Sequence, residues 1–333
     1  MQSTSIKWGI AGLGSIAHRF AKDLTQHTPN AQLAAVASRN LKQAESFAQQ
    51  YGCNKGYDSY YALAEDPSID VVYVASIHPF HKSVAAIFLE KGKHVLIEKP
   101  ATINEKEWDE LTALAKEKNC LCLEAMKTVT FPAYQQLLNF LKQNTIQIQS
   151  IEASNGTQLE FDEDHWIFNP SLSGGVTLDI GVYLLWLYCN LAYQLTGQLP
   201  LPSSRLLSTH YKIGVDEHAE FEFSAPIRGK LSASIVSALP REAIIKGPDL
   251  EIVIHDKWWN PKKISIQWQG KSFTIDEPIA GGGFQFEAIH VSDLILSNKT
   301  QSDVLPHSVT KHVIKIMEDS LTQHGFAHLV TSQ

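Results

Sequence analysis

The stretch Ile6-Lys-Trp-Gly-Ile-Ala-Gly-Leu-Gly-Ser-Ile-Ala17 decides the fold of this chain. It consists of an apolar strand that runs directly into a glycine turn, Gly12-x-Gly14-x-x-Ala17, which opens an amphipathic helix. Gly12 permits the tight turn, Gly14 allows close approach of a pyrophosphate, and the small Ala17 lets the helix pack on the strand. The N-terminus of such a helix offers unpaired N–H groups to phosphates. The pattern predicts a dinucleotide-binding unit; a glycine-rich turn without a ligand is the alternative interpretation.

A second apolar strand, residues 33–37, ends in Ser38, Arg39 and Asn40. Sites that prefer NAD usually carry an Asp or Glu near this position, where it bonds the ribose 2′-hydroxyl. Here a hydroxyl is followed by a guanidinium, which suits the 2′-phosphate of NADP. We therefore expect NADP to be preferred, with NAD as the alternative, although an exposed arginine after a strand is also ordinary surface chemistry.

The composition limits the class of protein. A length of 333 residues predicts two domains, and 44% hydrophobic residues are enough for a full core. The net charge of −7 and the lack of a basic stripe argue against nucleic acid as a partner. The apolar run 176–195 contains Asp179 and Asn190, so a buried helix explains it better than a membrane span. Without a leader-like segment or a C-x-x-C pair, we expect a reduced, cytoplasmic protein.

Strand and helix patterns alternate through the first third of the chain. Helices are expected over 41–51, 83–91 and 105–118, and strands over 71–76, 94–98 and 121–125. This rhythm predicts an α/β fold with an N-terminal Rossmann domain, a doubly wound parallel sheet, in residues 1–125.

From residue 126 to 333 the pattern changes. Alternating apolar and polar positions predict a C-terminal α+β domain with a large open, mostly antiparallel sheet, which is a candidate homodimer surface. Helices are expected over 176–195, 284–297 and 307–322.

Ligands of doubly wound sheets bind beyond the carboxyl ends of the strands. The candidate cofactor-binding residues at these ends are Gly12, Gly14, Ser15, Ile16, Ala17, Ser38, Arg39, Ser76, Ile77, Pro79, His81, Glu98, Lys99 and Pro100. Lys99 follows an apolar strand, where an ammonium can bond a ribose or substrate oxygen and favour the anion of a nearby phenol. A solvated surface lysine is the alternative. His78-x-x-His81 lacks an obvious third ligand, so no metal is expected.

A second group of candidate residues lies in the segment 173–183. Gly174-Gly175 marks a turn, and Asp179 and Tyr183 are four residues apart on the helix that follows, so they share one face. Burying a carboxylate and a phenol on an apolar helix is costly. Catalysis and a hydrogen-bonded structural pair both explain the pattern.

Three motifs in this order resemble those of the glucose–fructose oxidoreductase/inositol dehydrogenase/MocA (Gfo/Idh/MocA) family: the glycine turn, Glu98-Lys99-Pro100 and Gly174-Gly175…Asp179-Ile-Gly181-x-Tyr183. The resemblance covers nearly the whole chain, including Gly283-Phe284…Glu287…His290. Leu123-Glu-Ala-Met126 and Tyr183 are most similar to the branch of dimeric dihydrodiol dehydrogenases and NADP-dependent D-xylose dehydrogenases.

The resemblance implies an NADP-dependent enzyme that transfers a hydride between nicotinamide and a carbinol or carbonyl carbon of a sugar, cyclic polyol or dihydrodiol-like substrate. It implies that Lys99 is the cleft lysine, before a cis peptide to Pro100, and Tyr183 the general acid/base. Asp179 would hold the substrate hydroxyl or the lysine. Which of Lys99 and Tyr183 is the base stays open. A catalytically idle nucleotide-binding regulator and a reductase of a conjugated, non-sugar compound are the alternatives.

The chain departs from the branch at one place. Where those enzymes read E-A-M-W-T-R-F, this sequence has Lys127 and Val129. A lysine in place of the aromatic side chain would suit a more polar or anionic substrate, unless Lys127 faces solvent. The candidate substrate-binding residues are Lys127, Trp166, Asp179 and Tyr183.

Overall fold

The computed structural model describes residues 5–332, and the chain divides into two compact units. Unit 1 comprises the residues up to Thr102, Lys106–Lys127 and Ile279–His307, and unit 2 comprises Ile103–Glu105, Thr128–Pro278 and the residues from Ser308. The predicted division at residue 125 differs from these units because helix α8 (Phe284–Leu296) packs in unit 1. Its Ser292 hydroxyl accepts a hydrogen bond from the indole of Trp8 at 3.1 Å.

Unit 1 is built on a six-stranded sheet of order β3-β2-β1-β4-β5-β6 in which all strands are parallel. This confirms the predicted doubly wound sheet. Strand order reverses between β1 and β4, so the carboxyl ends of these two strands border the ligand crevice of such a fold. The strands are β1 (Ile6–Ala11), β2 (Ala31–Ala37), β3 (Lys55–Tyr57), β4 (Val71–Val74), β5 (His94–Glu98) and β6 (Cys122–Ala125).

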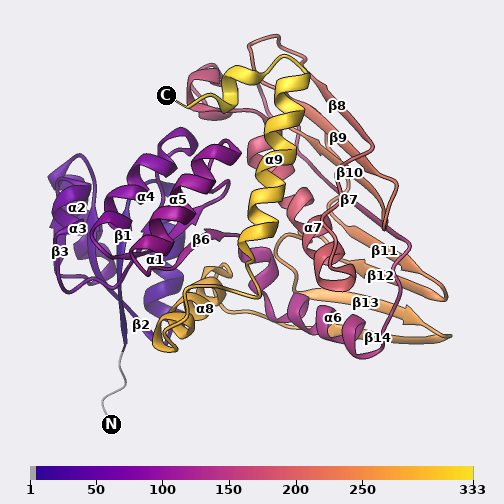
Figure 1. Ribbon diagram of the computed structural model, residues 1–333, viewed down its shortest axis with the longest axis horizontal. Coiled ribbons are helices and arrows are strands. Elements are labelled where there is room, and N and C mark those ends of the chain that lie inside the picture. The colour runs from indigo at the N-terminus through magenta and orange to yellow at the C-terminus, as the bar shows by residue number, and fades with distance from the viewer. Residues whose placement is uncertain (1–4, 333) are drawn as a thin grey trace. The chain divides into compact units, whose positions relative to one another are not determined.

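The helices of unit 1 cover this sheet (Figure 1). They are α1 (Ser15–His27), α2 (Leu41–Tyr51), α3 (Tyr60–Ala64), α4 (His81–Glu90), most of α5 (Glu105–Glu117), and α8, with the short 3₁₀ helix η1 (His78–Phe80) before α4. Helix α1 buries Ala17, Phe20 and Leu24 at helical spacing. The Phe20 ring stacks on Tyr73 of β4 with 3.7 Å between ring centres.

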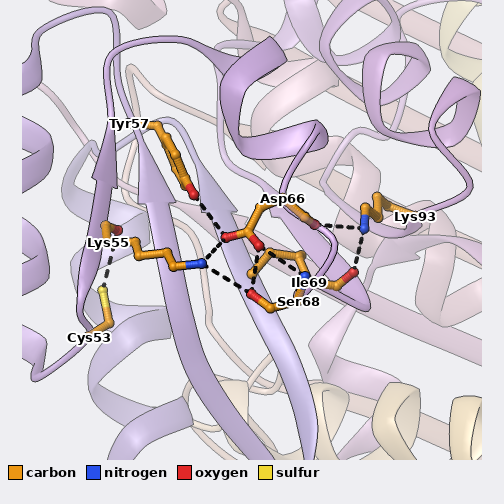
Figure 2. Close-up of polar contacts among 7 residues, drawn as sticks. All are labelled: Cys53, Lys55, Tyr57, Asp66, Ser68, Ile69 and Lys93. Atoms are coloured by element: carbon orange, nitrogen blue, oxygen red, sulfur yellow. Dashed lines mark hydrogen bonds and ion pairs between the residues drawn. The ribbon is translucent and has the colours of Figure 1, made fainter.

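A polar network joins the amino ends of β3, β4 and β5 (Figure 2). It lies at the opposite end of the strands from the carboxyl ends that border the crevice. The buried carboxylate of Asp66 accepts hydrogen bonds from Lys55 at 2.8 Å, Tyr57 at 2.9 Å and the Ser68 hydroxyl at 2.7 Å. Lys93 donates to the carbonyls of Asp66 and Ile69, both at 2.8 Å. These bonds fix the loop that leads into β4.

Unit 2 contains an eight-stranded sheet of order β14-β13-β12-β11-β7-β10-β9-β8. Neighbouring strands are antiparallel except β7 and β10, so the predicted large, mostly antiparallel sheet is confirmed. The strands are β7 (Ser150–Gly156), β8 (Ser204–Ser208), β9 (His218–Phe223), β10 (Arg228–Ser234), β11 (Ala243–Gly247), β12 (Leu250–Ile254), β13 (Lys263–Trp268) and β14 (Lys271–Asp276).

Helices pack against one face of this sheet (Figure 1). The helical segments of unit 2 are η2 (Lys127–Thr130) and α9 (His307–Gln323) without their first residues, α6 (Pro132–Gln143), η3 (Trp166–Phe168), η4 (Pro170–Leu172), the π-helical η5 (Thr177–Gly181), α7 (Val182–Thr196) and η6 (Ala327–Val330). The packed face is apolar, with Ile151, Leu231 and Ile245 buried. The opposite face carries charges: on it, Lys230 lies opposite Glu222 of β9 and Glu152 of β7.

Candidate functional site

The glycine turn after β1 has the geometry that a bound pyrophosphate needs. Gly12 has φ +91°, and a side chain there would lie 2.7 Å from the carbonyl of Ala75. A side chain at Gly14 would point into open space, and in the described part of the chain no side chain caps the N-terminus of α1. The hydroxyl oxygen of Ser76, just past β4, is buried without a hydrogen-bond partner among the described residues. These groups fit a dinucleotide phosphate held by backbone N–H groups.

The end of β2 is organised by a residue that sequence reasoning missed. The Ser38 hydroxyl donates to Oε1 of Gln43 at 2.6 Å, and Nε2 of Gln43 donates to the carbonyl of Leu13 at 3.4 Å. Gln43 therefore ties the β2 end to the glycine turn. Its signal in the sequence is weak: a polar residue in the first turn of α2, after the N-cap Asn40. Arg39 is exposed, and within residues 5–332 nothing hydrogen-bonds or pairs with its guanidinium.

The loops after β4 and β5 are held together by His81. Its ring is fully buried, with Nε2 at 2.8 Å from the carbonyl of Ser76 and Nδ1 at 2.8 Å from the carbonyl of Pro100. The ring is thus in contact with the backbone of both loops, whereas Ile77, in the loop after β4, is exposed. Burial lowers the pKa of His81. The described residues contain no group of three or more His, Cys, Asp or Glu side chains arranged for a metal ion.

The Glu98-Lys99-Pro100 motif stands at the end of β5. Glu98 is buried, and its carboxylate accepts hydrogen bonds from the Tyr73 hydroxyl and, at 3.1 Å, from the backbone N–H of Lys99. Burial raises the pKa of Glu98, while the Tyr73 bond opposes this. The Lys99–Pro100 peptide is cis, and Lys99 is partly exposed between buried neighbours.

Lys127 lies in the interior rather than in solvent. Its side chain is 6% exposed, and its ammonium nitrogen is 3.5 Å from the carbonyl of Gly282. Burial is the main cause that lowers the pKa of Lys127 to about 8, and the negative charges of Glu287 and Glu98 oppose the shift. Glu287 of α8 is fully buried, and neither carboxylate oxygen has a hydrogen-bond partner among the described residues. Sequence reasoning gave Glu287 no role.

In unit 2 the first part of the long apolar helix is buried except for one strip. Between Ser173 and Ala192, every residue is buried except Asp179, Ile180 and Tyr183. Asp179 lies in the π-helical turn η5 and Tyr183 at the start of α7. π-helical turns inside α-helices are frequent at functional sites. The stretch Pro170–Thr196 is long and apolar enough to cross a membrane, but 78% of its apolar window is buried, as in a core helix.

The start of this helix is closely packed. Gly174 lies against η3, because a side chain there would be 2.4 Å from the carbonyl of Ile167. This contact brings Trp166, which is partly exposed, to the same end of the helix as Asp179. The carboxylate of Asp216 accepts hydrogen bonds from the backbone N–H and the hydroxyl of Thr177. Sequence reasoning missed Asp216 because its partners are far away in the sequence.

The predicted site residues thus form two groups. Unit 1 gathers those at the carboxyl ends of its strands: Gly12, Gly14, Ser15, Ile16, Ala17, Ser38, Arg39, Ser76, Ile77, Pro79, His81, Glu98, Lys99 and Pro100. Unit 2 gathers Trp166, Asp179 and Tyr183 at one end of its long helix, and Lys127 lies inside unit 1.

Known proteins with similar sequences are oxidoreductases. The sequence model of the Gfo/Idh/MocA proteins, described as an oxidoreductase family with an NAD-binding Rossmann fold, matches residues 6–126. A trans-1,2-dihydrobenzene-1,2-diol dehydrogenase from Xenopus tropicalis is 32% identical over 97% of this chain and 99% of the relative. The human protein of the same name is 30% identical over 95% of this chain and 96% of the relative.

Solved structures share the fold. A 3-ketoreductase from Actinomadura kijaniata, in complex with NADP and TDP-benzene, has a TM-score of 0.83 and 22% identity over 96% of this chain and 97% of the other.

Proposed function

Because this chain belongs to the Gfo/Idh/MocA family of NAD(P)-binding oxidoreductases, we propose that it is an NADP-dependent dehydrogenase or reductase. Its substrate would be a small sugar, cyclic polyol or dihydrodiol-like compound that is oxidised at a carbinol carbon or reduced at a carbonyl. The observation that carries this proposal is the strip of Asp179 and Tyr183, which with Ile180 are the partly exposed residues in the buried stretch 173–192. When bound, the nicotinamide supplies the hydride chemistry.

The cofactor would be held by the strand ends of unit 1. The N–H groups at the start of α1 bind the pyrophosphate, and Ser76 offers a buried hydroxyl without a partner among the described residues. Ser38 and Arg39 bind the 2′-phosphate of NADP, because a free guanidinium forms charge-assisted hydrogen bonds with phosphate oxygens. Gln43 orients Ser38, and His81 orients the loops that carry Ser76 and Pro100.

The proton of the substrate hydroxyl would be handled by Tyr183. In the oxidative direction the phenol oxygen takes the proton, and in the reductive direction it returns it. As the family resemblance implies, Lys99 would share in the proton transfer and Asp179 would bind the substrate hydroxyl. The solved forms of the A. kijaniata ketoreductase include substitutions of one lysine and of one tyrosine, at the same separation along the chain as Lys99 and Tyr183. The substrates of the dihydrodiol dehydrogenase relatives support a ring carbinol as the reacting group.

The environment and assembly of the protein belong to the same proposal. The four cysteines, 53, 120, 122 and 189, are all buried and free, which supports the reducing cytoplasm as its compartment.

A second copy would cover the charged face of the eight-stranded sheet, because alternating Glu152, Lys230 and Glu222 allow opposite charges to meet across a two-fold axis. Light scattering of a Lys230→Glu variant tests this: a dimer that persists unchanged argues against that surface.

Two measurements test the function. Fluorescence titration with NADPH and NADH gives the cofactor preference, and absorbance of the nicotinamide reports turnover with dihydrodiols, sugars, polyols and diketones. Tight NADPH binding with turnover of one class supports the proposal and names the substrate class. Binding without turnover of any compound favours a nucleotide-binding regulator, and turnover of a conjugated non-sugar compound alone favours the third alternative.

A further inference from the structure

We infer that Asp216 is a positioning residue that holds the segment bearing Asp179 and Tyr183 in its active geometry. The inference rests on the proposed function, since it gives these two residues their catalytic meaning. All the groups involved belong to unit 2.

Asp216 supplies the hydrogen-bond acceptors that the start of the helix lacks locally. Val176, the N-cap, makes no side-chain cap hydrogen bond. Oδ2 of Asp216 instead accepts from the Thr177 N–H at 2.9 Å and the Thr177 hydroxyl at 2.6 Å, and its backbone carbonyl accepts from the Val176 N–H at 2.9 Å. Capping bonds of this kind fix where a helix begins and how its first turn is oriented. Asp179 lies in that turn, and Tyr183 lies in the next.

Gly175 is the residue that lets the carboxylate reach this place. It has φ +100°, and a side chain there would lie 2.2 Å from Oδ1 of Asp216. The glycine pair therefore does more than turn the chain, because it leaves the space that Asp216 fills. The Gly174-Gly175 turn and Asp216 are therefore in direct contact, although they are far apart in the sequence.

Within residues 5–332, no cation forms an ion pair with the Asp216 carboxylate. Asp216 is fully buried, and Oδ1 has no hydrogen-bond partner among the described residues. From the helix side it faces the donors of Thr177. From its own segment the charge that acts on it is that of Glu217, whose carboxylate turns away to accept from the N–H groups of Tyr211 and His210. Burial is the main cause that raises the pKa of Asp216 to about 6.

Protonation of this group would loosen the segment. A neutral carboxyl accepts weaker hydrogen bonds than a carboxylate. Turnover is therefore expected to fall as the pH decreases through about 6, the value to which burial raises the pKa of Asp216. Ionising a buried carboxylate with a raised pKa costs folding free energy above that pH. Asp216→Asn should therefore keep or raise the melting temperature at pH 8 while it lowers turnover.

The experiment compares Asp216→Asn with the wild type and with Glu217→Gln, the adjacent buried acid that faces the other way. In Asp216→Asn we expect kcat at pH 8 to fall about tenfold or more, as for a slightly misplaced catalytic group. The acid limb of the pH profile of kcat, the decrease near pH 6, should disappear, and the NADPH affinity should not change. Glu217→Gln should retain that limb. Wild-type kcat with an intact acid limb in Asp216→Asn would overturn the inference.

Hydrogen exchange provides a readout that does not depend on activity. The amides of 174–183 should exchange faster in Asp216→Asn, and also, to a smaller degree, in Thr177→Val, which removes only the hydroxyl donor. Unchanged exchange in both variants would refute the positioning role. If Tyr183→Phe left turnover intact, the assignment of proton transfer to Tyr183 would fail, whereas the exchange of these amides would still decide whether Asp216 holds the segment.

Discussion

The ammonium nitrogen of Lys127 lies 4.2 Å from the centre of the Phe284 ring, in the interior of unit 1. Glu98 and Glu287 are buried in the same region and act on its charge. Arg19 and Asp23 also act on this charge, so that Lys127 belongs to a cluster of two cations and three carboxyl groups. Removing one member of a buried charge cluster is costly because it leaves the opposite charge without compensation.

Lys127→Met is therefore expected to lower the free energy of unfolding by about 3 kcal/mol at pH 7, where a pKa of about 8 leaves the Lys127 ammonium mostly charged. The loss should be smaller at pH 5, because burial raises the pKa of both Glu98 and Glu287 and both become easier to neutralise. The double variant Lys127→Met/Glu287→Gln should lose less than Lys127→Met alone. Urea unfolding at both pH values measures this; equal losses at pH 5 and pH 7 would contradict the charge argument.

Asp66 is the acceptor on which the polar network at the amino ends of the strands depends (Figure 2). Asp66→Ala should lower the free energy of unfolding by about 2–3 kcal/mol, because it removes a buried carboxylate that accepts several hydrogen bonds, and bonds to charged groups are the stronger ones. Lys55→Met is the control, since Lys55 is 48% exposed and surface pairs contribute about 1 kcal/mol or less.

The pH dependence gives a second test of Asp66. The hydrogen bond from Lys55 and those from Ser68 and Tyr57 hold the pKa of Asp66 below its usual value of 3.8, against the opposing effect of burial. The stability that this carboxylate contributes is therefore present above about pH 4 and is lost as the pH falls further. Unfolding curves of Asp66→Ala should lack this part of the acid destabilisation. A wild-type slope in the variant would show that other carboxylates cause it.

Local patterns predicted much of the fold. The expected helix 41–51 and strand 94–98 coincide with α2 and β5, because each has an apolar period that a single element satisfies. The π-helical turn at Thr177–Gly181 was not predicted, nor was the contact where it begins, in which Asp216 from a distant part of the chain bonds to Thr177 and lies against Gly175. Propensity and periodicity contain no information on such contacts.

For the candidate site, too, local patterns in the sequence did not predict the long-range contacts of the side chains. The sequence located the glycine turn and the strip of Asp179 and Tyr183, which depend on short-range spacing. That Lys127 binds the substrate stays a prediction; the sequence did not indicate that its ammonium is buried beside Phe284. That His81 binds the cofactor also stays a prediction; the sequence did not indicate that its ring lies between two backbone carbonyls. In both cases the residue type suggested chemistry, and the long-range fold determined where the side chain lies.

The free guanidinium of Arg39 gives a test of cofactor preference. Arg39→Ala should weaken NADPH binding about 10- to 100-fold, the loss of one or two charge-assisted hydrogen bonds to a phosphate. NADH affinity should not change, because NADH has no 2′-phosphate. Lys42→Ala removes a neighbouring exposed cation and is the matched control. Equal weakening of both nucleotides by Arg39→Ala would refute recognition of the 2′-phosphate.

The role of Tyr183 can be tested against a matched control, because a second tyrosine lies on the same helix. It is partly exposed at the start of α7, and Tyr193 is partly exposed near the end of the same helix. If the Tyr183 phenol transfers the proton, Tyr183→Phe should lower kcat by about 10²- to 10⁴-fold. Stability and NADPH affinity should be retained, because the ring remains and the cofactor residues lie in unit 1.

Tyr193→Phe removes the same atom from the same helix and should leave kcat unchanged. Single-turnover absorbance at the nicotinamide band, with binding measured separately, distinguishes loss of proton transfer from loss of cofactor. If kcat of Tyr183→Phe stays within a few-fold of the wild type, proton transfer must be reassigned to Lys99, the other group for which the sequence motif provides the chemistry. A Lys99→Met variant with the expected loss would then identify the ammonium as the proton carrier and leave Tyr183 a binding role.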